Sequence, residues 1–320
     1  MGSVNNSKLI VLLLVLISCS KQNIGTAELS VTLGDYFADK DVDYHKTKKR
    51  AIWPTPSIYP SNKIVLTFDD GPGPYTNKLL DIFAEYNKDR PEGQKAFATF
   101  FVLGENLSKY PEVAKRIIED GHILASHDWN HTNNNKENQT LFESDLAKSI
   151  VAVEEVYASL GIERKEIYFR FPYGEYGKNG GYHHLDSIKK VGDKLYGENC
   201  LNYAFWDYDT NDWVKKMTSE MIALNTFNML PAVKEMILYD RMKKDGIWTP
   251  IKVEIDASYK HGGVSLMHDV HLRSVLATKI LLDKIETHNS TSRDEDKIEV
   301  VALDTVTEYQ YDERECTLVD

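Results

Sequence analysis

The chain has 320 residues, of which 42% are hydrophobic and 27% charged, which is enough to build one large domain with a buried core. Its net charge is −11, and the acidic residues are spread along the chain. Nucleic acid is excluded as a partner, because a phosphate backbone requires clustered Lys and Arg, and the one basic run, HKTKKR at residues 45–50, lies in a predicted linker.

The first twenty residues resemble an export signal rather than part of a fold. Lys8 precedes an apolar run from Leu9 to Ile17, which is too short to cross a bilayer but has the length of a signal-peptide core. The run leads into LISC, which resembles a bacterial lipobox, so residues 1–18 are the expected signal peptide and Cys19 the expected lipidation site. Lipidation would anchor the protein to a bacterial envelope membrane, facing the periplasm or the exterior. The alternative is an ordinary secretory signal cleaved nearby.

Residues 19–60 are polar, irregular and proline-containing, which predicts a tether. Beyond them, short apolar runs alternate with amphipathic segments of helical length. Strands that alternate with helices pair in parallel through crossover helices, which predicts a barrel or a doubly wound α/β sheet. The expected domain covers residues 61–305, and residues 306–320 form a C-terminal tail.

The predicted elements follow one another regularly. Strands are expected at 63–68, 95–104, 122–127, 167–171, 202–209, 262–269 and 297–303, and helices at 76–88, 109–121, 140–161, 185–196 and 272–285. An insertion at 214–260 interrupts this rhythm. It has mixed helical character over 219–246 and a possible strand pair over 247–259, and an insertion beside strand ends commonly shapes a site.

Two further cysteines, Cys200 and Cys316, remain after Cys19. In an exported protein they can form a disulfide, but two unrelated free thiols fit the sequence equally well. Neither stands beside an activating base, which argues against a nucleophilic cysteine.

Polar residues follow the apolar runs where the carboxyl ends of parallel strands would gather functional side chains. Singly, each has a structural explanation: aspartates before Gly-Pro are usually turn residues, and a pair of histidines four apart, here expected on one face of a helical turn, is usually a surface pair. Their joint occurrence at strand ends indicates a site. The set is Asp69, Asp70, His127, His131, Arg170, Asp209, Asp212 and His268.

The chemistry of this set is coherent. Two imidazoles and one carboxylate make a three-ligand zinc site with an open position for water. Asp69 and Asp70 need not do the same job, because successive strand residues point to opposite sides, so one can bind the metal while the other takes a proton from water. Arg170 would keep that base ionised, and His268 could protonate the leaving group. These residues indicate metal-assisted hydrolysis of an amide or ester.

Five motifs occur in order: TFDDGP (67–72), HDWNH (127–131), RFPYG (170–174), DTNDW (209–213) and LMH (266–268). With them, roughly residues 61–305 resemble the NodB-homology polysaccharide deacetylases, carbohydrate esterase family four. The resemblance implies a distorted (β/α) barrel with about seven strands, here with the long insertion at 214–260. One position departs from the family: Asp128 stands where Ser or Thr is usual, and it would either brace the loop or add negative charge near the metal.

The resemblance also assigns roles. Asp69 would be the catalytic base, with Arg170 orienting it, and Asp212 would tune His268 as the general acid. Asp70, His127 and His131 would hold one divalent metal ion, Zn²⁺ first, with Co²⁺ or Ni²⁺ as substitutes. Three further residues would contact the substrate. The backbone N–H of Tyr173 would stabilise the oxyanion, and the side chains of Trp213 and Leu266 would line a pocket for the acetyl methyl group.

The expected function is removal of N-acetyl groups from N-acetylglucosamine residues of an envelope or extracellular polysaccharide, and the export signal favours peptidoglycan. Chitooligosaccharide deacetylation and acetylxylan O-deacetylation use the same chemistry. An inactive glycan-binding lipoprotein is the non-enzymatic alternative. A glycosidase would need paired carboxylates across a glycosidic bond and would leave the two histidines unexplained.

Overall fold

The computed structural model describes residues 61–165, 167–177, 183–197, 200–305, 316 and 318. The expected signal peptide, Cys19, the tether and most of the tail after residue 305 lie outside the described residues, so these expectations stay predictions. Within the described part, no helix combines the length and the apolar character that crossing a membrane requires.

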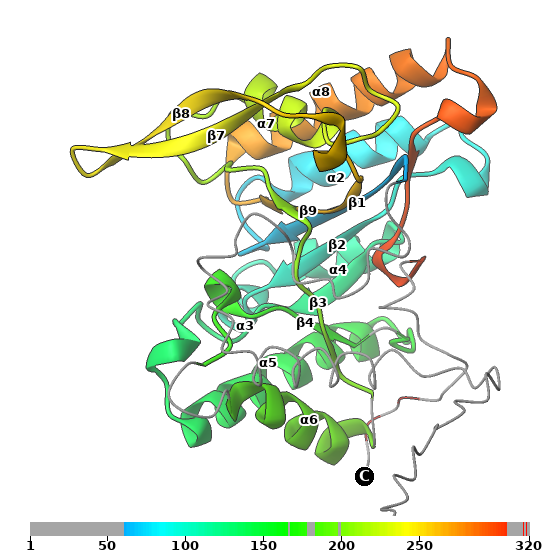
Figure 1. Cartoon of the computed structure of the whole chain (residues 1–320). Coiled ribbons are helices and arrows are strands. Elements are labelled where there is room, and N and C mark those ends of the chain that lie inside the picture. Colours follow the sequence, from blue (N-terminus) through cyan, green and yellow to red (C-terminus); the bar gives the residue numbers. More distant parts are fainter. Residues whose placement is uncertain are drawn as a thin grey trace, which may run out of the picture.

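One parallel sheet forms the centre of the domain. Its order is β5-β4-β3-β2-β1-β9-β6, and β10 pairs with the start of β1. The expected distorted (β/α) barrel with about seven strands is confirmed (Figure 1). The strands are β1 Lys63–Asp69, β2 Ala98–Val102, β3 Ile123–Ser126, β4 Tyr168–Phe169, β5 Asn202–Tyr203, β6 Tyr208–Asp209, β9 Gly263–His268 and β10 Glu299–Val300.

The expected single strand at 202–209 is wrong, because this stretch forms two short strands at opposite edges of the sheet. Only Ala204–Asp207 separates β5 from β6, and five Cα steps reach at most about 18 Å. Seven strands laid flat would put the two edges about 29 Å apart. The sheet must therefore curve until its edges nearly meet, and the residues between β5 and β6 close the barrel.

Helices cover the outside of this sheet. Figure 1 shows α2, α7 and α8 along one flank and α5 and α6 along the other, near β4. All five predicted helices are present, α7 falls within the range of predicted helical character at 219–246, and α3 is additional. The α-helices are α2 Thr76–Asn87, α3 Gly104–Leu107, α4 Pro111–Glu119, α5 Gln139–Ser159, α6 His183–Tyr196, α7 Ser219–Phe227 and α8 Leu272–Asn289. Short 3₁₀ turns lie at Glu92–Gln94, Asn134–Lys136, Pro172–Gly174, Ala257–Tyr259, Asp294–Asp296 and Leu303–Thr305.

Strand β1 shows how the two faces of the sheet differ. Alternate residues point to opposite faces, and both faces are buried. One set, Ile64, Leu66 and Phe68, packs in the core under the helices. The other set faces the inside of the barrel, where Val65 joins an apolar cluster and Asp69 meets the buried Arg170. The strand thus supplies a packed core on one side and a buried ion pair on the other.

The insertion at 214–260 is only partly helical. The expected helical character ends with α7, and residues 237–244 form strand β7 (Ile237–Lys244), which pairs antiparallel with β8 (Ile247–Glu254). The predicted strand pair within 247–259 is therefore wrong, since β8 occupies most of that range and its partner precedes it. The two-residue turn Asp245–Gly246 has φ of 51° and 79°, and Asp-Gly is a favoured sequence for such a hairpin turn.

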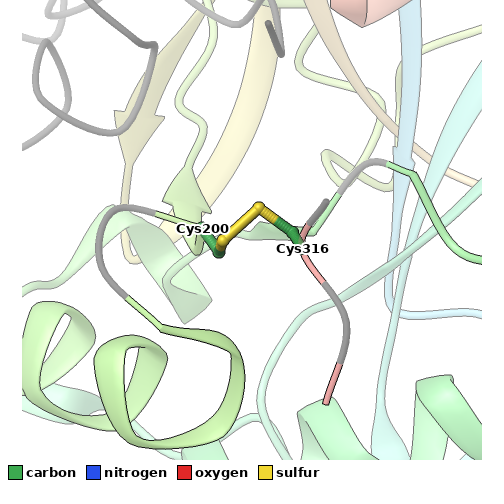
Figure 2. The surroundings of a disulfide bond; sticks show 2 residues. All are labelled: Cys200 and Cys316. Carbon is green, nitrogen blue, oxygen red and sulfur yellow. A yellow bond between two sulfur atoms is a disulfide. The ribbon is translucent and has the colours of Figure 1, made fainter. Parts of the chain in front are cut away.

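A disulfide joins Cys200 to Cys316, which decides the open question in favour of pairing. Figure 2 shows the bond; the two Cα atoms are 5.6 Å apart, and the cysteines are 116 positions apart in sequence. Cys200 lies two residues before β5, and both cysteines are buried in the core cluster under α5 and α6. The bond attaches the C-terminal tail to this cluster.

Removing this disulfide should destabilise the protein. The double substitution Cys200→Ser with Cys316→Ser opens a long loop, which gives the unfolded chain more conformational entropy and should lower the free energy of unfolding by roughly 2–4 kcal/mol. Calorimetry should show a lower Tm for the double variant, and a reductant should lower the Tm of the wild type but not that of the variant. Equal Tm values for all four samples would contradict the structural role of the bond.

Candidate active site

Asp70, His127 and His131 converge at the carboxyl end of the sheet. The Oδ1 atom of Asp70 lies 3.2 Å from Nε2 of His131 and 3.6 Å from Nε2 of His127. Two donors held about 2.0–2.1 Å from a zinc ion at a tetrahedral angle are about 3.3 Å apart, so these spacings suit one cation. The three predicted ligands are therefore brought together.

The loop that carries the histidines is not the expected helical turn. His127 follows β3, and the chain then takes left-handed backbone conformations at Asp128 (φ 70°) and His131 (φ 58°). Asp70 is also left-handed, with φ 74°, and its carbonyl accepts a hydrogen bond of 2.9 Å from Nδ2 of Asn106. These turns, rather than helical spacing, bring the ligand atoms together.

Two features of the trio fit a bound cation. The buried Oδ1 of Asp70 has no hydrogen-bond partner among the described residues, an arrangement that is costly unless something binds there. Nδ1 of His127 is 2.8 Å from the Arg170 carbonyl, which can only accept, so Nδ1 carries the proton and Nε2 is left free toward Asp70. Burial lowers the pKa of His127 to about 3, which keeps the ring neutral, as a ligand requires.

Asp69 forms a buried ion pair with Arg170 inside the barrel. Nη1 of Arg170 donates to Oδ1 of Asp69 at 2.8 Å, and the guanidinium is fully buried. The other carboxylate oxygen, Oδ2, lies 3.7 Å from Nε2 of His127, so it faces the trio. Burial raises the pKa of Asp69 to about 6, although Arg170 opposes that rise. A carboxylate with this pKa can act as a base near neutral pH.

Asp212, which is buried, and His268, which is half-buried, form a second pair. Nδ1 of His268 donates to Oδ1 of Asp212 at 2.7 Å, and Oδ2 accepts from the His268 backbone N–H and the Ser274 hydroxyl at 2.6 and 2.5 Å. Burial disfavours the charged imidazolium, but the carboxylates, Asp212 above all, raise the pKa of His268 to about 10. Burial likewise opposes ionisation of Asp212, yet His268 and these hydrogen bonds lower the pKa of its carboxyl group.

The pairing of β1 with β9 brings the two pairs together. In this register Asp69 is directly opposite His268, and Thr67 is opposite Leu266. Residues opposite each other on neighbouring strands point to the same face of the sheet. The predicted base and the predicted acid therefore project side by side into the barrel mouth.

The remaining predicted residues surround this centre. The ring of Tyr173 lies 4.4 Å from the ring of His131. Tyr173 has φ 59° and lies in the short 3₁₀ turn Pro172–Gly174. The N–H groups at the start of such a turn have no partner within it. Leu266 is buried two residues before His268, and Trp213, half-buried, donates from Nε1 to Asp209 at 3.1 Å. The geometry is compatible with their expected roles.

Sequence reasoning missed several supporting side chains. Ser274 lies one turn into α8, where a serine gives no signal of a role at Asp212. Asp269, next to His268, accepts a hydrogen bond from Thr76, and its carboxylate packs so closely against Gly71 of the TFDDGP loop that a Cβ there would lie 2.4 Å from it. The only sequence signal for Asp269 is its position directly after the LMH motif.

Asp128 braces the histidine loop, one of the two roles considered for it. Its Oδ1 accepts from the Trp129 backbone N–H at 2.8 Å and its Oδ2 from Nδ2 of Asn134 at 3.0 Å. Both carboxylate oxygens are thus directed into the loop rather than being free for a cation. Burial raises the pKa of Asp128 to about 6.

Comparisons with known proteins agree with this geometry. Residues 58–186 match the family model described as "Polysaccharide deacetylase". The chain is 28% identical over 218 residues to the peptidoglycan-N-acetylmuramic acid deacetylase PdaC of Bacillus subtilis, covering 67% of this chain and 40% of that protein. It is 33% identical over 169 residues to a peptidoglycan-N-acetylglucosamine deacetylase of Bacillus cereus, covering 52% of each.

A chitin deacetylase of Arthroderma benhamiae is 30% identical over 229 residues, covering 70% of this chain and 48% of that protein. The chain thus spans about half, or less, of the length of these relatives. A crystal structure of a peptidoglycan N-acetylglucosamine deacetylase has a TM-score of 0.52 at 24% identity, covering 77% of this chain and 88% of the other. This likeness supports the fold.

Replacing Asp212 should change the titration of His268. In Asp212→Asn the carboxylate that favours the imidazolium is lost while burial remains, so the pKa of His268 should fall from about 10 to near or below its ordinary value of 6.5. An NMR titration of the His268 ring in metal-free protein measures this. Ser274→Ala is the control: it keeps the carboxylate, so it should move the pKa much less. An unchanged pKa in Asp212→Asn would contradict the pairing.

Proposed function

We propose that the protein is a metal-dependent hydrolase that removes N-acetyl groups from N-acetylglucosamine residues of an envelope polysaccharide, because residues 58–186 match the model of the polysaccharide deacetylase family. The observation that carries the proposal is the meeting of an Asp-His-His trio with the buried carboxylate of Asp69 and the half-buried imidazole of His268 at the carboxyl end of the sheet. Among the possible substrates we rank peptidoglycan first, because two relatives are named as peptidoglycan deacetylases and the N-terminus resembles an export signal.

Asp70, His127 and His131 would hold one divalent cation. Zn²⁺ is the proposed metal because a set of two imidazoles and one carboxylate suits it, and Co²⁺ or Ni²⁺ would substitute. When bound, the cation supplies a positive charge that polarises the acetyl carbonyl and makes a water molecule more acidic.

Asp69 would take the proton of the attacking water. Arg170 occupies Oδ1 of Asp69 and so orients the carboxylate, while Oδ2, which faces the trio, accepts the proton. The ion pair also keeps a fully buried carboxylate ionised, since an unpaired one would protonate. The pKa of about 6 leaves Asp69 largely ionised at neutral pH.

His268 would protonate the leaving amine nitrogen. Its Nδ1–H is held by Asp212, so Nε2 is the atom that can give up a proton to the substrate. The raised pKa of His268 keeps the imidazolium populated at neutral pH. The backbone N–H of Tyr173 would donate to the oxyanion, and Trp213 and Leu266 would line the pocket for the acetyl methyl group.

The same centre suits two other substrates, a chitooligosaccharide and, by O-deacetylation, acetylxylan. A glycosidase is disfavoured by the geometry, because both oxygens of Asp212 and one of Asp69 are occupied by His268, Ser274 and Arg170. An inactive glycan-binding lipoprotein is disfavoured because the base, the trio and the acid are all assembled. Acetate release from peptidoglycan, chitooligosaccharides and acetylxylan, with and without added Zn²⁺, ranks the substrates.

Asp69→Asn should abolish catalysis and leave metal binding intact. The amide cannot take the proton of water, so kcat for acetate release should fall on the order of 10²–10⁴-fold. Metal analysis should still find the cation, since the three ligands are unchanged. His127→Ala is the comparison: it should lose both the metal and the activity. Full metal content in His127→Ala would contradict the ligand assignment, and full activity in Asp69→Asn would contradict the base.

The export signal leads to a proposal about location. We propose that Cys19 carries a lipid that anchors the protein to an envelope membrane. In a bacterial host that processes lipoproteins, wild-type protein should be found in the membrane fraction, and Cys19→Ser protein should leave it. Equal membrane association of the two proteins would contradict lipidation and favour an ordinary secretory signal.

A further inference from the structure

The β7–β8 hairpin, called the arm here, is attached to the reaction centre by Arg241. The guanidinium lies 4.7 Å from the ring of Trp213 and 5.8 Å from the ring of Trp248, and it forms an ion pair of 3.2 Å with Asp209. The two indole rings meet edge to face at 5.9 Å. Trp213 immediately follows Asp212, the partner of His268, so the arm begins next to the catalytic groups.

The register of the arm shows which residues share the face that contacts Trp213. Cross-strand partners lie on the same face of a hairpin, and successive pairs alternate between faces. The pair Arg241–Pro250 is therefore on the same face as Lys243–Trp248. The intervening and following pairs, Met242–Thr249 and Lys244–Ile247, are on the opposite face. Figure 1 shows the arm extending from the domain on the side where β1 and β2 end.

Trp248 and Lys243 lie further out on the face that contacts Trp213. Trp248 is 38% exposed, and Nζ of Lys243 lies 5.5 Å from the centre of its ring. Within the described part of the chain, Lys243 has no carboxylate within ion-pair distance. A partly exposed indole offers an apolar face for a sugar ring, and an unpaired ammonium attracts a carboxylate.

The charge of the arm differs from that of the whole protein. Residues 237–254 contain four Lys or Arg residues and three Asp or Glu residues, whereas the chain has a net charge of −11. An acidic ligand is therefore repelled less by the arm than by the average surface. Because the arm adjoins the catalytic centre, a polymer bound there would place a neighbouring unit within reach of it.

We propose that Trp248 and Lys243 form a saccharide subsite that binds a polymer unit whose substituent ends in a carboxylate, beside the unit being deacetylated. The inference rests on the proposed function and narrows its substrate class to carboxylate-bearing polysaccharides. Peptidoglycan carries such groups on its lactyl and peptide substituents, whereas chitooligosaccharides carry none. The indole binds the sugar ring, and the ammonium selects the acidic unit.

Steady-state kinetics on two substrates tests the subsite. Lys243→Gln should raise the KM for soluble peptidoglycan fragments about 2- to 5-fold at low salt, as expected for an exposed ion pair, and leave the KM for chitooligosaccharides of the same sugar number unchanged. The difference should shrink at high salt. Trp248→Ala should raise both KM values about 2- to 10-fold, and Trp248→Tyr should retain most of the binding. The kcat values should not change.

Matched controls lie on the opposite face of the same hairpin. Lys244→Gln and Ile247→Ala remove the same kinds of group one position away, at residues that point away from Trp213, so neither should alter KM. An equal effect of these controls, an unchanged KM in both Lys243→Gln and Trp248→Ala, or a Trp248→Ala change confined to kcat would each overturn the subsite.

Different measurements test the proposed function and the subsite. If the wild type releases no acetate from any substrate, the proposed function fails, and the subsite is then tested by binding alone. Calorimetry with peptidoglycan fragments would still show a Kd about 2- to 5-fold higher for Lys243→Gln than for Lys244→Gln. Equal Kd values for these two variants would overturn the subsite whatever the activity of the wild type.

Discussion

The buried ion pair of Arg170 and Asp69 is the interaction on which the rest of the structure depends. Two charges taken out of water cost several kcal/mol each, and this is offset only when their hydrogen-bonding groups are satisfied. Arg170 meets this condition: besides Asp69 it donates to the hydroxyl of Thr67 and to the carbonyls of Ala204 and Phe205. Those carbonyls belong to the segment that closes the barrel. The Arg170 side chain therefore links the end of β4 to β1 and to the segment between the two edge strands. The backbone carbonyl of Arg170 also accepts a hydrogen bond from His127. Arg170 therefore contributes both to closing the barrel and to holding the candidate active site.

Parallel pairing explains how a small set of residues assembles the candidate active site. The register of β1 with β9 sets the proposed base Asp69 opposite the proposed acid His268, and the left-handed turns after β1 and β3 bring the trio to the same carboxyl end of the sheet. Each proposed catalytic group is held by a second group: Asp69 by Arg170, His268 by Asp212, and Asp212 in turn by Ser274. Such support keeps the donor atoms in place before a substrate arrives. The insertion adds to this rigid centre an arm fixed through Arg241.

The regular part of the fold could be predicted because its signals are local. Apolar runs and amphipathic periods marked the five helices and most strands, and polar residues at strand ends marked Asp69, Asp70, His127, Arg170 and His268. The predictions are wrong where contacts between residues far apart in the sequence determine the secondary structure. The stretch at 202–209 resembles one strand, and only the curvature of the sheet divides it between two edges. The residue pattern of 237–244 predicts helical character, whereas the following Asp245–Gly246 favours a hairpin turn, and the structure follows the turn signal.

By itself, the sequence determined the alternation of strands and helices and the order of the motifs, because hydrophobic periodicity and residue chemistry are properties of the chain. Tertiary structure alone decided which cysteines pair, that Ser274 supports Asp212, and that Arg241 lies between Trp213 and Trp248. The first two contacts join residues 116 and 62 positions apart, and Arg241 in β7 reaches Trp248 in β8 and Trp213 outside the hairpin. Such contacts depend on how the sheet curves and how the hairpin packs, and no short window of sequence encodes either.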